Sequence, residues 1–251
     1  MNKHNWAIAK LNLKNIKTPY FVTGLIFSIV FVQSIVYTII AIASNNAGEQ
    51  LQISSGNYFW LLIILAAIFI PAKNFRRIVN LGGKREGFLW GSLTSYAVLA
   101  GAVAIANTFL YYTYERLLIS TGYYSGYEEF IQNTAIMDNH YISVNLIEVF
   151  GWLKNGAVIA FVQQFAFLFL LATVIHTLTA MQDKWYGWVT DAIIAAILGT
   201  FIPIAPLRAW LIRFFNLILF NSNAYMQIAA CILLAIAVYG LSKLIFVRKA
   251  I

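Results

Sequence analysis

The sequence predicts an all-α integral membrane protein with six transmembrane helices, and three observations support this fold class. First, 61% of the 251 residues are hydrophobic and only 10% are charged, whereas soluble domains carry about 25% charged residues. Second, six apolar runs approach the roughly 20 residues that a helix needs to cross the hydrocarbon core. They cover residues 20–44, 58–71, 88–112, 156–179, 187–204 and 223–247. Third, most basic residues fall in segments on one side of these runs.

The segment before the first run is predicted to form a short amphipathic elbow helix within residues 1–19. At about 100° per residue, one face carries Lys3, Lys10, Lys14 and Lys17, and a neighbouring face carries Trp6, Ala9, Leu13 and Ile16. Pro19 is expected to end this helix, because proline lacks a backbone donor. We expect an anchor on anionic lipid, or a helix that also packs on a cytoplasmic partner. The segment does not resemble a removable signal peptide.

Two other apolar runs differ from an ordinary span. Residues 58–71 are short, and we expect their helix to extend in both directions. Residues 207–220 are too short to cross and contain Arg208 and Arg213, so we expect a short outer interfacial or re-entrant helix before the last span. No polar stretch reaches the roughly 50 residues that a small domain needs. Residues 1–251 are therefore expected to form a single transmembrane domain.

The distribution of charge predicts the orientation of the chain. With the N-terminus inside, most of the 17 Lys and Arg residues lie in cytoplasmic segments and most acids lie outside, as the positive-inside rule requires. Tryptophans fit the same orientation, since they favour membrane interfaces. Trp60, Trp152 and Trp210 fall at the outer boundary, and Trp90, Trp185 and Trp188 at the inner one. We expect a multi-pass protein with cytoplasmic N- and C-termini, whose charge of +8 reflects topology and not nucleic-acid binding.

Two segments between the spans stand out. Residues 72–88 form a cytoplasmic turn with five basic residues, paired glycines and Glu86; a basic loop is expected there from topology alone, but the acid and the glycines add detail that topology does not require. Residues 113–153 form the longest segment outside the membrane and are rich in acids and tyrosines. Amphipathic pieces at 130–136 and 142–153 favour an extracellular cap of helices, with a plain solvated loop as the alternative.

Polar side chains within spans are expensive in lipid and usually face protein or water. The candidates are Gln33, Thr94, Ser95, Asn107, Gln163, Gln164 and Gln227. Hydrogen bonds between helices would explain all of them. The functional alternative places Gln33, Asn107, Gln163 and Gln164 along a translocation path. Gln163 and Gln164 point about 100° apart, so at most one of them faces a narrow path.

The sequence offers little for catalysis. The nearest approach to a phosphate-binding loop, Gly82-Gly83-Lys84-Arg85, lacks the spacing and the hydroxyl residue of that motif. Cys231 is the only cysteine, so neither a disulfide nor a cysteine-based metal site is expected. No H-E-x-x-H motif occurs, and His176 is the only histidine in a span. We therefore expect no enzyme activity, no catalytic residues, and no cofactor or metal in this chain.

The elbow helix, the six spans and the turn together resemble the permease subunit of type-2 ABC exporters, of the small bacterial six-span half-transporter kind. The matching residues of the turn are Asn80, Leu81, Gly82, Gly83, Lys84, Arg85, Glu86 and Phe88. In that family this segment looks like the coupling helix that docks into a cleft of a separate ATPase. The chain departs from the family at Gly83, where many members have serine, and this weakens any helix-capping role at that position.

The resemblance implies a division of labour between subunits. ATP and Mg would be bound by a partner ATPase on the cytoplasmic face, and a second permease copy, identical or similar, would complete the pathway in the bacterial cell membrane. Apolar walls with scattered amides would suit export of a hydrophobic or amphipathic substrate, such as a peptide, toxin or antibiotic. The alternatives are a secondary transporter or channel without an ATPase, and a structural scaffold. Broken helices are common in secondary transporters, and Pro203 and Pro206 break the end of the fifth span.

Overall fold

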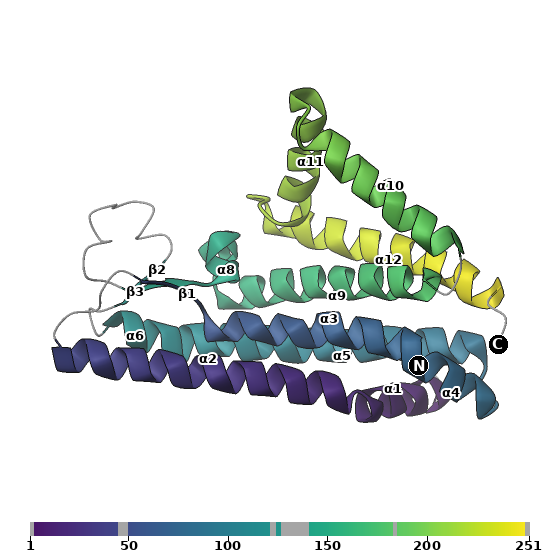
Figure 1. The fold of residues 1–251 in the computed structure, drawn as a ribbon, viewed down its shortest axis with the longest axis horizontal. Coiled ribbons are helices and arrows are strands. Elements are labelled where there is room, and N and C mark those ends of the chain that lie inside the picture. The colour runs from purple at the N-terminus through teal and green to yellow at the C-terminus, as the bar shows by residue number, and fades with distance from the viewer. Residues whose placement is uncertain (1–2, 45–49, 121–123, 127–140, 183–184, 249–251) are drawn as a thin grey trace. The chain divides into compact units, whose positions relative to one another are not determined.

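The computed structural model describes residues 3–44, 50–120, 124–126, 141–182 and 185–248, and helices dominate these ranges (Figure 1). The all-α fold class predicted from the sequence is confirmed. The chain divides into two compact units, which are described separately. Unit 1 comprises Met1–Lys17, Ile63–Ala100 and Phe165–Ile251, and unit 2 comprises Thr18–Leu62 and Gly101–Gln164.

Five helical runs among the described residues are long and apolar enough to cross a membrane. The first is α2 (Lys17–Ser44). The second, Ser55–Asn80, joins η1 (Ser55–Phe59), α3 (Trp60–Phe69), η2 (Ile70–Asn74) and α4 (Phe75–Asn80). The third, Arg85–Ser120, joins α5 (Arg85–Leu110), η3 (Tyr111–Glu115) and α6 (Arg116–Ser120). The others are α9 (Ala157–Met181) and α12 (Ala224–Arg248).

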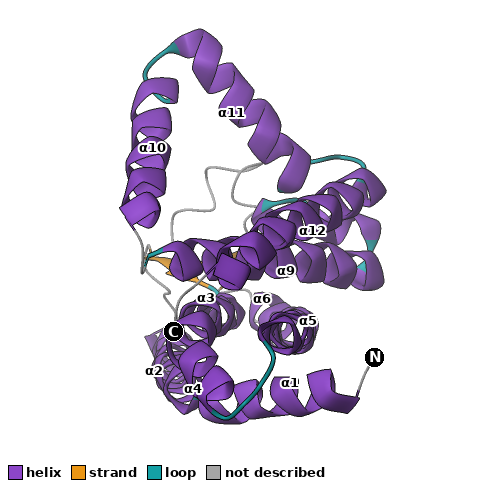
Figure 2. Ribbon diagram, turned by 90° about the vertical axis from the view of Figure 1, so that its right-hand side faces the viewer, coloured by secondary structure: helices purple, strands orange, loops and turns teal. Residues whose placement is uncertain are grey.

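These runs match the predicted first, second, third, fourth and sixth spans, and the second extends in both directions as expected. The predicted fifth span and interfacial helix correspond to α10 (Trp185–Phe201) and α11 (Ala205–Ile218). Gly187–Phe201 and Ala205–Ile218 pass the same test only as a pair, and they are bent by 115°. Figure 2 shows the corner at which they meet. The described residues thus hold five spans, or six if this pair is one broken span.

The elbow helix of unit 1 is α1 (Lys3–Asn15). It ends before Ile16, and α2 begins at Lys17, so the prediction that Pro19 ends it is wrong. Pro19 lies instead in the first turn of α2. A proline is tolerated there because the backbone N–H groups of a first turn have no partner within the helix. Pro19 therefore does not mark the boundary between α1 and α2.

One side of α1 is buried against α5. Ala9 and Asn12 are fully buried, and Asn12 Nδ2 donates a hydrogen bond to Ser92 Oγ at 3.3 Å. A Cβ atom added at Gly91 would lie 2.5 Å from Ile8 Cγ2 and 3.3 Å from the Ala9 nitrogen. Small residues on α5 therefore let the two backbones approach closely, as is common between membrane helices.

We predict that Gly91→Ala lowers the stability of unit 1 by about 1–3 kcal/mol, the usual cost of overpacking. Purified Gly91→Ala protein should show a lower Tm and faster tryptic cleavage after Lys10 and Lys14. Gly199→Ala is the matched control, because a Cβ at Gly199 meets nothing within 4 Å. Equal melting and cleavage of the two variants would contradict the close packing of α1.

Unit 2 contains a small sheet that the sequence did not predict. Strands β1 (Gln50–Ile53), β2 (Tyr124–Gly126) and β3 (Tyr141–Val144) pair in parallel in the order β1-β3-β2. The amphipathic piece at 142–153 therefore begins as strand β3 and continues into two short helices, α8 (Leu146–Val149) and η5 (Trp152–Asn155). The other predicted piece, 130–136, lies outside the described residues.

Candidate functional site: a basic turn and an adjoining apolar pocket

The turn between α4 and α5 is closed by backbone hydrogen bonds. The Gly83 N–H donates to Ile78 O and the Gly82 N–H donates to Val79 O, both at 2.9 Å, which is the pattern of a Schellman motif. Gly82 has φ +81°, the left-handed conformation that this motif requires and that glycine adopts at little cost. The paired glycines thus end α4 sharply and allow α5 to begin at Arg85.

Gly83 is required by packing as well as by the turn. A Cβ atom at this position would lie 2.6 Å from Ile78 Cγ2 and 2.8 Å from Ile78 O. A serine there would collide with the backbone of α4. The carbonyls of Ile78 and Val79 at the end of α4 are bonded by the backbone N–H groups of Gly83 and Gly82.

The residues predicted to couple to a partner divide into surface and core. Asn80, Leu81, Gly82, Lys84 and Glu86 are exposed, and Gly83 and Arg85 are partly buried. Phe88, in contrast, is fully buried. Its ring centroid lies 5.2 Å from that of Phe75 and 5.4 Å from that of Phe246. Phe88 therefore anchors the turn to unit 1 and is not available to a docking partner, although the coupling role of its neighbours stays a prediction.

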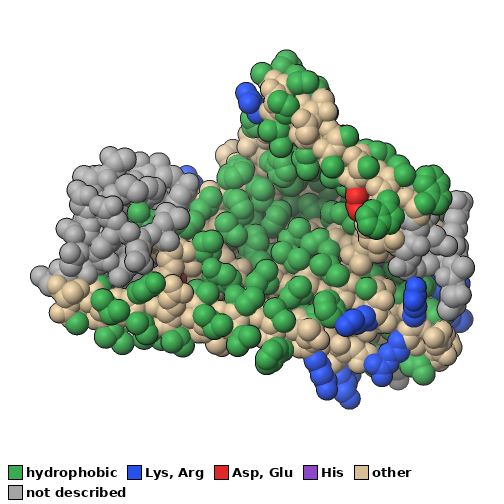
Figure 3. Space-filling model, viewed as in Figure 1, with side chains coloured by type: hydrophobic (Ala, Val, Ile, Leu, Met, Phe, Trp, Pro, Cys, Tyr) green, Lys and Arg blue, Asp and Glu red, His purple; other side chains and the backbone are tan. Residues whose placement is uncertain are grey.

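The basic side chains around this turn form one surface. Figure 3 shows Lys and Arg side chains gathered around α1 and α4. The exposed members are Lys10, Lys14, Lys17, Lys73, Arg76, Arg77 and Lys84. A cationic surface of this kind, bordered by Glu86, is suited to a partner with acidic groups or to anionic headgroups.

Helix α12 is fastened to the start of α5. Arg85 Nη1 donates to Phe246 O at 3.3 Å, and Tyr239 OH donates to Leu89 O at 2.5 Å. Lys243 Nζ lies 3.5 Å from Glu86 Oε1. Sequence reasoning missed Tyr239 and Lys243 as neighbours of the turn, because more than a hundred residues separate the partners in each pair and no local pattern marks them.

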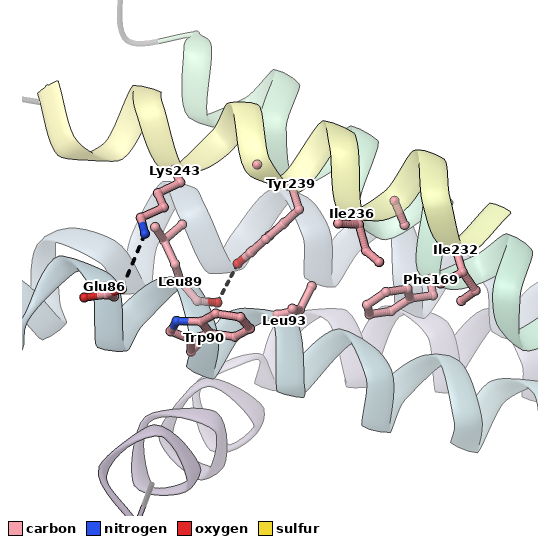
Figure 4. A pocket seen from close by; sticks show the side chains of 11 residues that line it. Glu86, Leu89, Trp90, Leu93, Phe169, Ile232, Ile236, Tyr239 and Lys243 are labelled. Carbon is pink, nitrogen blue, oxygen red and sulfur yellow. Dashed lines mark hydrogen bonds and ion pairs between the residues drawn. The ribbon is translucent and has the colours of Figure 1, made fainter. Parts of the chain in front are cut away.

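A pocket of about 490 Å³ lies between α5, α9 and α12. Figure 4 shows the side chains that line it, with Tyr239 reaching across to α5 and Lys243 above Glu86. The lining is Glu86, Leu89, Trp90, Leu93, Phe169, Ile232, Ala235, Ile236, Tyr239, Gly240 and Lys243. The only charged members are Glu86 and Lys243. The pocket can therefore hold an apolar group with a polar end.

Below the turn, His176 is buried in an aromatic cluster of unit 1. Its Nδ1 lies 2.7 Å from the hydroxyl of Tyr96, and its ring centroid lies 5.3 Å from that of Tyr239 and 5.4 Å from that of Phe246. The histidine is fully buried. The hydrogen bond at Nδ1 and the ring contacts hold the imidazole in place within this cluster. Among the described residues, no group of three His, Cys, Asp or Glu could hold a metal ion.

The four residues predicted for a translocation path all lie in unit 2, and the structure brings two of them together. In the amide orientation that satisfies both its polar atoms, Gln164 accepts hydrogen bonds from Asn107 Nδ2 at 2.8 Å and Trp60 Nε1 at 2.9 Å. Gln163 is also buried. Gln33 is on an exposed part of α2, where its Nε2 donates to Tyr37 OH at 3.1 Å. Asn107 and Gln164 thus join α5 to α9, and a place for the four residues on a translocation path stays a prediction.

A buried carboxylate in unit 2 was not singled out from the sequence. Glu115, at the end of η3, is 4% exposed and accepts hydrogen bonds from Ser54 Oγ and from Asn145 Nδ2, the latter at 3.0 Å. Asn145 Oδ1 also caps α8 through the Ile147 N–H at 3.1 Å. The carboxylate therefore joins three segments that are distant in sequence. In the sequence, the only sign of a special role for Glu115 is its position just beyond an apolar run.

We predict that Gly83→Ala destabilises the turn by about 1–3 kcal/mol, since the new methyl group meets the α4 backbone. Limited trypsin digestion should cleave after Lys84 and Arg85 faster than in the wild type. Gly24→Ala is the control, because a Cβ there meets nothing within 4 Å and alanine is a good helix former. Protection of Gly83→Ala equal to that of the control would show that the turn tolerates a side chain.

We predict that Glu115→Ala costs about 1–3 kcal/mol for each buried donor left without an acceptor. Glu115→Gln should cost less, because its side-chain oxygen still accepts hydrogen bonds from Ser54 and Asn145. The Tm values of the purified variants should fall in the order wild type, Gln, Ala. A wild-type Tm for Glu115→Ala would contradict the bridging role of the carboxylate.

Comparison with protein-family models, curated proteins and solved structures finds no match to this chain. The class that the fold defines is a multi-span helical membrane protein of five or six spans.

Proposed function

We propose that this chain is the permease subunit of an ATP-driven ABC exporter that works with a separate ATPase. The observation that carries the proposal is the turn at residues 80–88, together with the resemblance of these residues to a coupling helix. The turn is short, exposed and basic on its outer side. On its inner side Phe88, Arg85 and Glu86 connect it to the helices of unit 1.

This construction supports a mechanical role for the turn. The Schellman motif fixes the end of α4 relative to the start of α5, and both helices continue directly into membrane spans. A force applied to Leu81 or Lys84 would therefore be transmitted to α4 and α5, because no flexible loop separates these helices. The sequence of the chain contains no phosphate-binding loop. The partner on the cytoplasmic face would therefore bind ATP and Mg, and ATP hydrolysis there would supply the energy for transport.

A second permease copy is part of the proposal. The side chains at positions 191–200 of α10 are exposed, and they include Asp191, whose Oδ2 accepts a hydrogen bond from Gln182 Nε2 at 2.7 Å. Ten consecutive residues lie on every side of a helix, so α10 has room for a neighbour, and in a homodimer or a pair with a similar permease the second copy would pack there. The transported substrate would be hydrophobic or amphipathic, such as a peptide, toxin or antibiotic, and would leave the cell.

We predict that an ATPase with a phosphate-binding loop copurifies with the tagged chain when neighbouring genes are coexpressed. Lys84→Glu should reduce its recovery at least about tenfold, since a reversed charge at an interface is costly. Arg208→Glu is the matched control, because Arg208 is also exposed but is predicted to lie outside the cell. Recovery of the ATPase with Lys84→Glu at the level of Arg208→Glu would overturn docking at the turn.

A secondary transporter or channel is the second candidate, and the 115° bend between α10 and α11 favours it. Discontinuous helices often surround substrate sites in such proteins. The two functions differ in their energy source. Transport by the purified chain in vesicles without any ATPase would support the second candidate and reject the first.

A further inference from the structure

We propose that the apolar pocket between α5, α9 and α12 is a binding site for one zwitterionic phospholipid. Its acyl chains lie against the helices, and its headgroup lies at the Glu86–Lys243 pair. The site belongs to unit 1 alone. The inference does not depend on an ATPase partner.

The depth of the pocket fits one leaflet of a bilayer. Along α12 the lining runs from Ile232 to Lys243, and at 1.5 Å per residue this distance is about 16 Å. The hydrocarbon core is roughly 30 Å thick, so the pocket spans about half of it. The volume of about 490 Å³ is within the range of small-molecule sites, about 300–1,000 Å³. Its walls are too apolar to hold ordered water, and acyl chains are the apolar groups that a membrane supplies.

A second hollow next to the first supports a lipid with two chains. It has a volume of about 540 Å³ and is lined by Asn5, Trp90, Leu93, Thr94, Ala97 and Phe169. Trp90, Leu93 and Phe169 line both hollows, so the two volumes adjoin along α5 and α9. One diacyl lipid could therefore place one chain in each hollow. Trp90 is 52% exposed, as is typical of a tryptophan at the headgroup level.

The charged end of the pocket selects the headgroup. Lys243 and Glu86 are the two charged residues of the lining, their nitrogen and oxygen lie 3.5 Å apart, and their side chains are 58% and 66% exposed. A headgroup can thus reach both. A phosphate would accept hydrogen bonds from the Lys243 ammonium, and a headgroup amine would donate to the Glu86 carboxylate. One cation beside one anion complements a zwitterion such as phosphatidylethanolamine better than an anionic lipid.

The test is native mass spectrometry of the purified, delipidated chain titrated with dioleoyl phosphatidylethanolamine or dioleoyl phosphatidylglycerol. Gly240→Leu places a side chain in the pocket, because Gly240 lines it and a Cβ there meets nothing within 4 Å. Gly24→Leu is the control, with equally open space on α2. We expect one phosphatidylethanolamine per chain in the wild type and in Gly24→Leu, and a loss of at least about fivefold in Gly240→Leu, since its side chain occupies the volume that the lipid needs.

The headgroup is tested separately with Lys243→Gln, an exposed substitution that should leave the fold intact. It should weaken phosphatidylethanolamine binding by about two- to fivefold, the scale of an exposed charge pair. The wild type should bind phosphatidylglycerol more weakly than phosphatidylethanolamine. Retention of lipid by Gly240→Leu at the level of Gly24→Leu would overturn the site. Equal binding of the two lipids by the wild type would overturn the zwitterionic headgroup.

Discussion

No water is available in the hydrocarbon core to hydrogen-bond to the backbone, and this constraint shapes nearly every element of the chain. Each N–H and C=O at membrane depth must find a partner within the protein, and an α-helix provides these partners within its own segment. The long apolar runs accordingly form helices, and the short paired strands β1, β2 and β3 occur in loop segments between the spans. The same constraint acts on side chains, and hydrogen bonds join buried polar residues of neighbouring helices, as between Asn107 and Gln164 and between Tyr96 and His176.

Close packing in unit 1 depends on where side chains are missing. Because Gly91 has no Cβ, α1 can approach the backbone of α5 closely. Because Gly83 has none, the turn can pack against Ile78 at the end of α4. The larger side chains then lock the arrangement, with Phe88 and Phe246 in contact beneath the turn and Tyr239 bonded to the α5 backbone. The turn therefore has a packed base and an exposed basic outer side, as the proposed docking of an ATPase requires.

The spans could be predicted from the sequence because twenty apolar residues in a row are a local signal. The extension of the second span could also be predicted, since its apolar core was too short to cross alone. The break at Ile16 was missed because a proline in a first turn and a proline after a last turn look alike in sequence. The sheet and the Glu115 cluster were missed for another reason. Strand β1 pairs with β3, and Ser54 meets Asn145, across about ninety residues, and one sequence alone carries no signal for such pairs.

The bend between α10 and α11 decides on which side of the membrane the chain ends. Five complete crossings would place the two termini on opposite sides, and a sixth would return the C-terminus to the side of the N-terminus. The lysines of the first seventeen residues and the basic residues from Lys243 to Lys249 both favour the cytoplasm, because basic segments resist translocation. The charges at the two ends thus predict one further crossing between α9 and α12, made either by α10 alone with α11 at the interface, as the sequence predicts, or by the bent pair as one broken span with the 115° corner inside it.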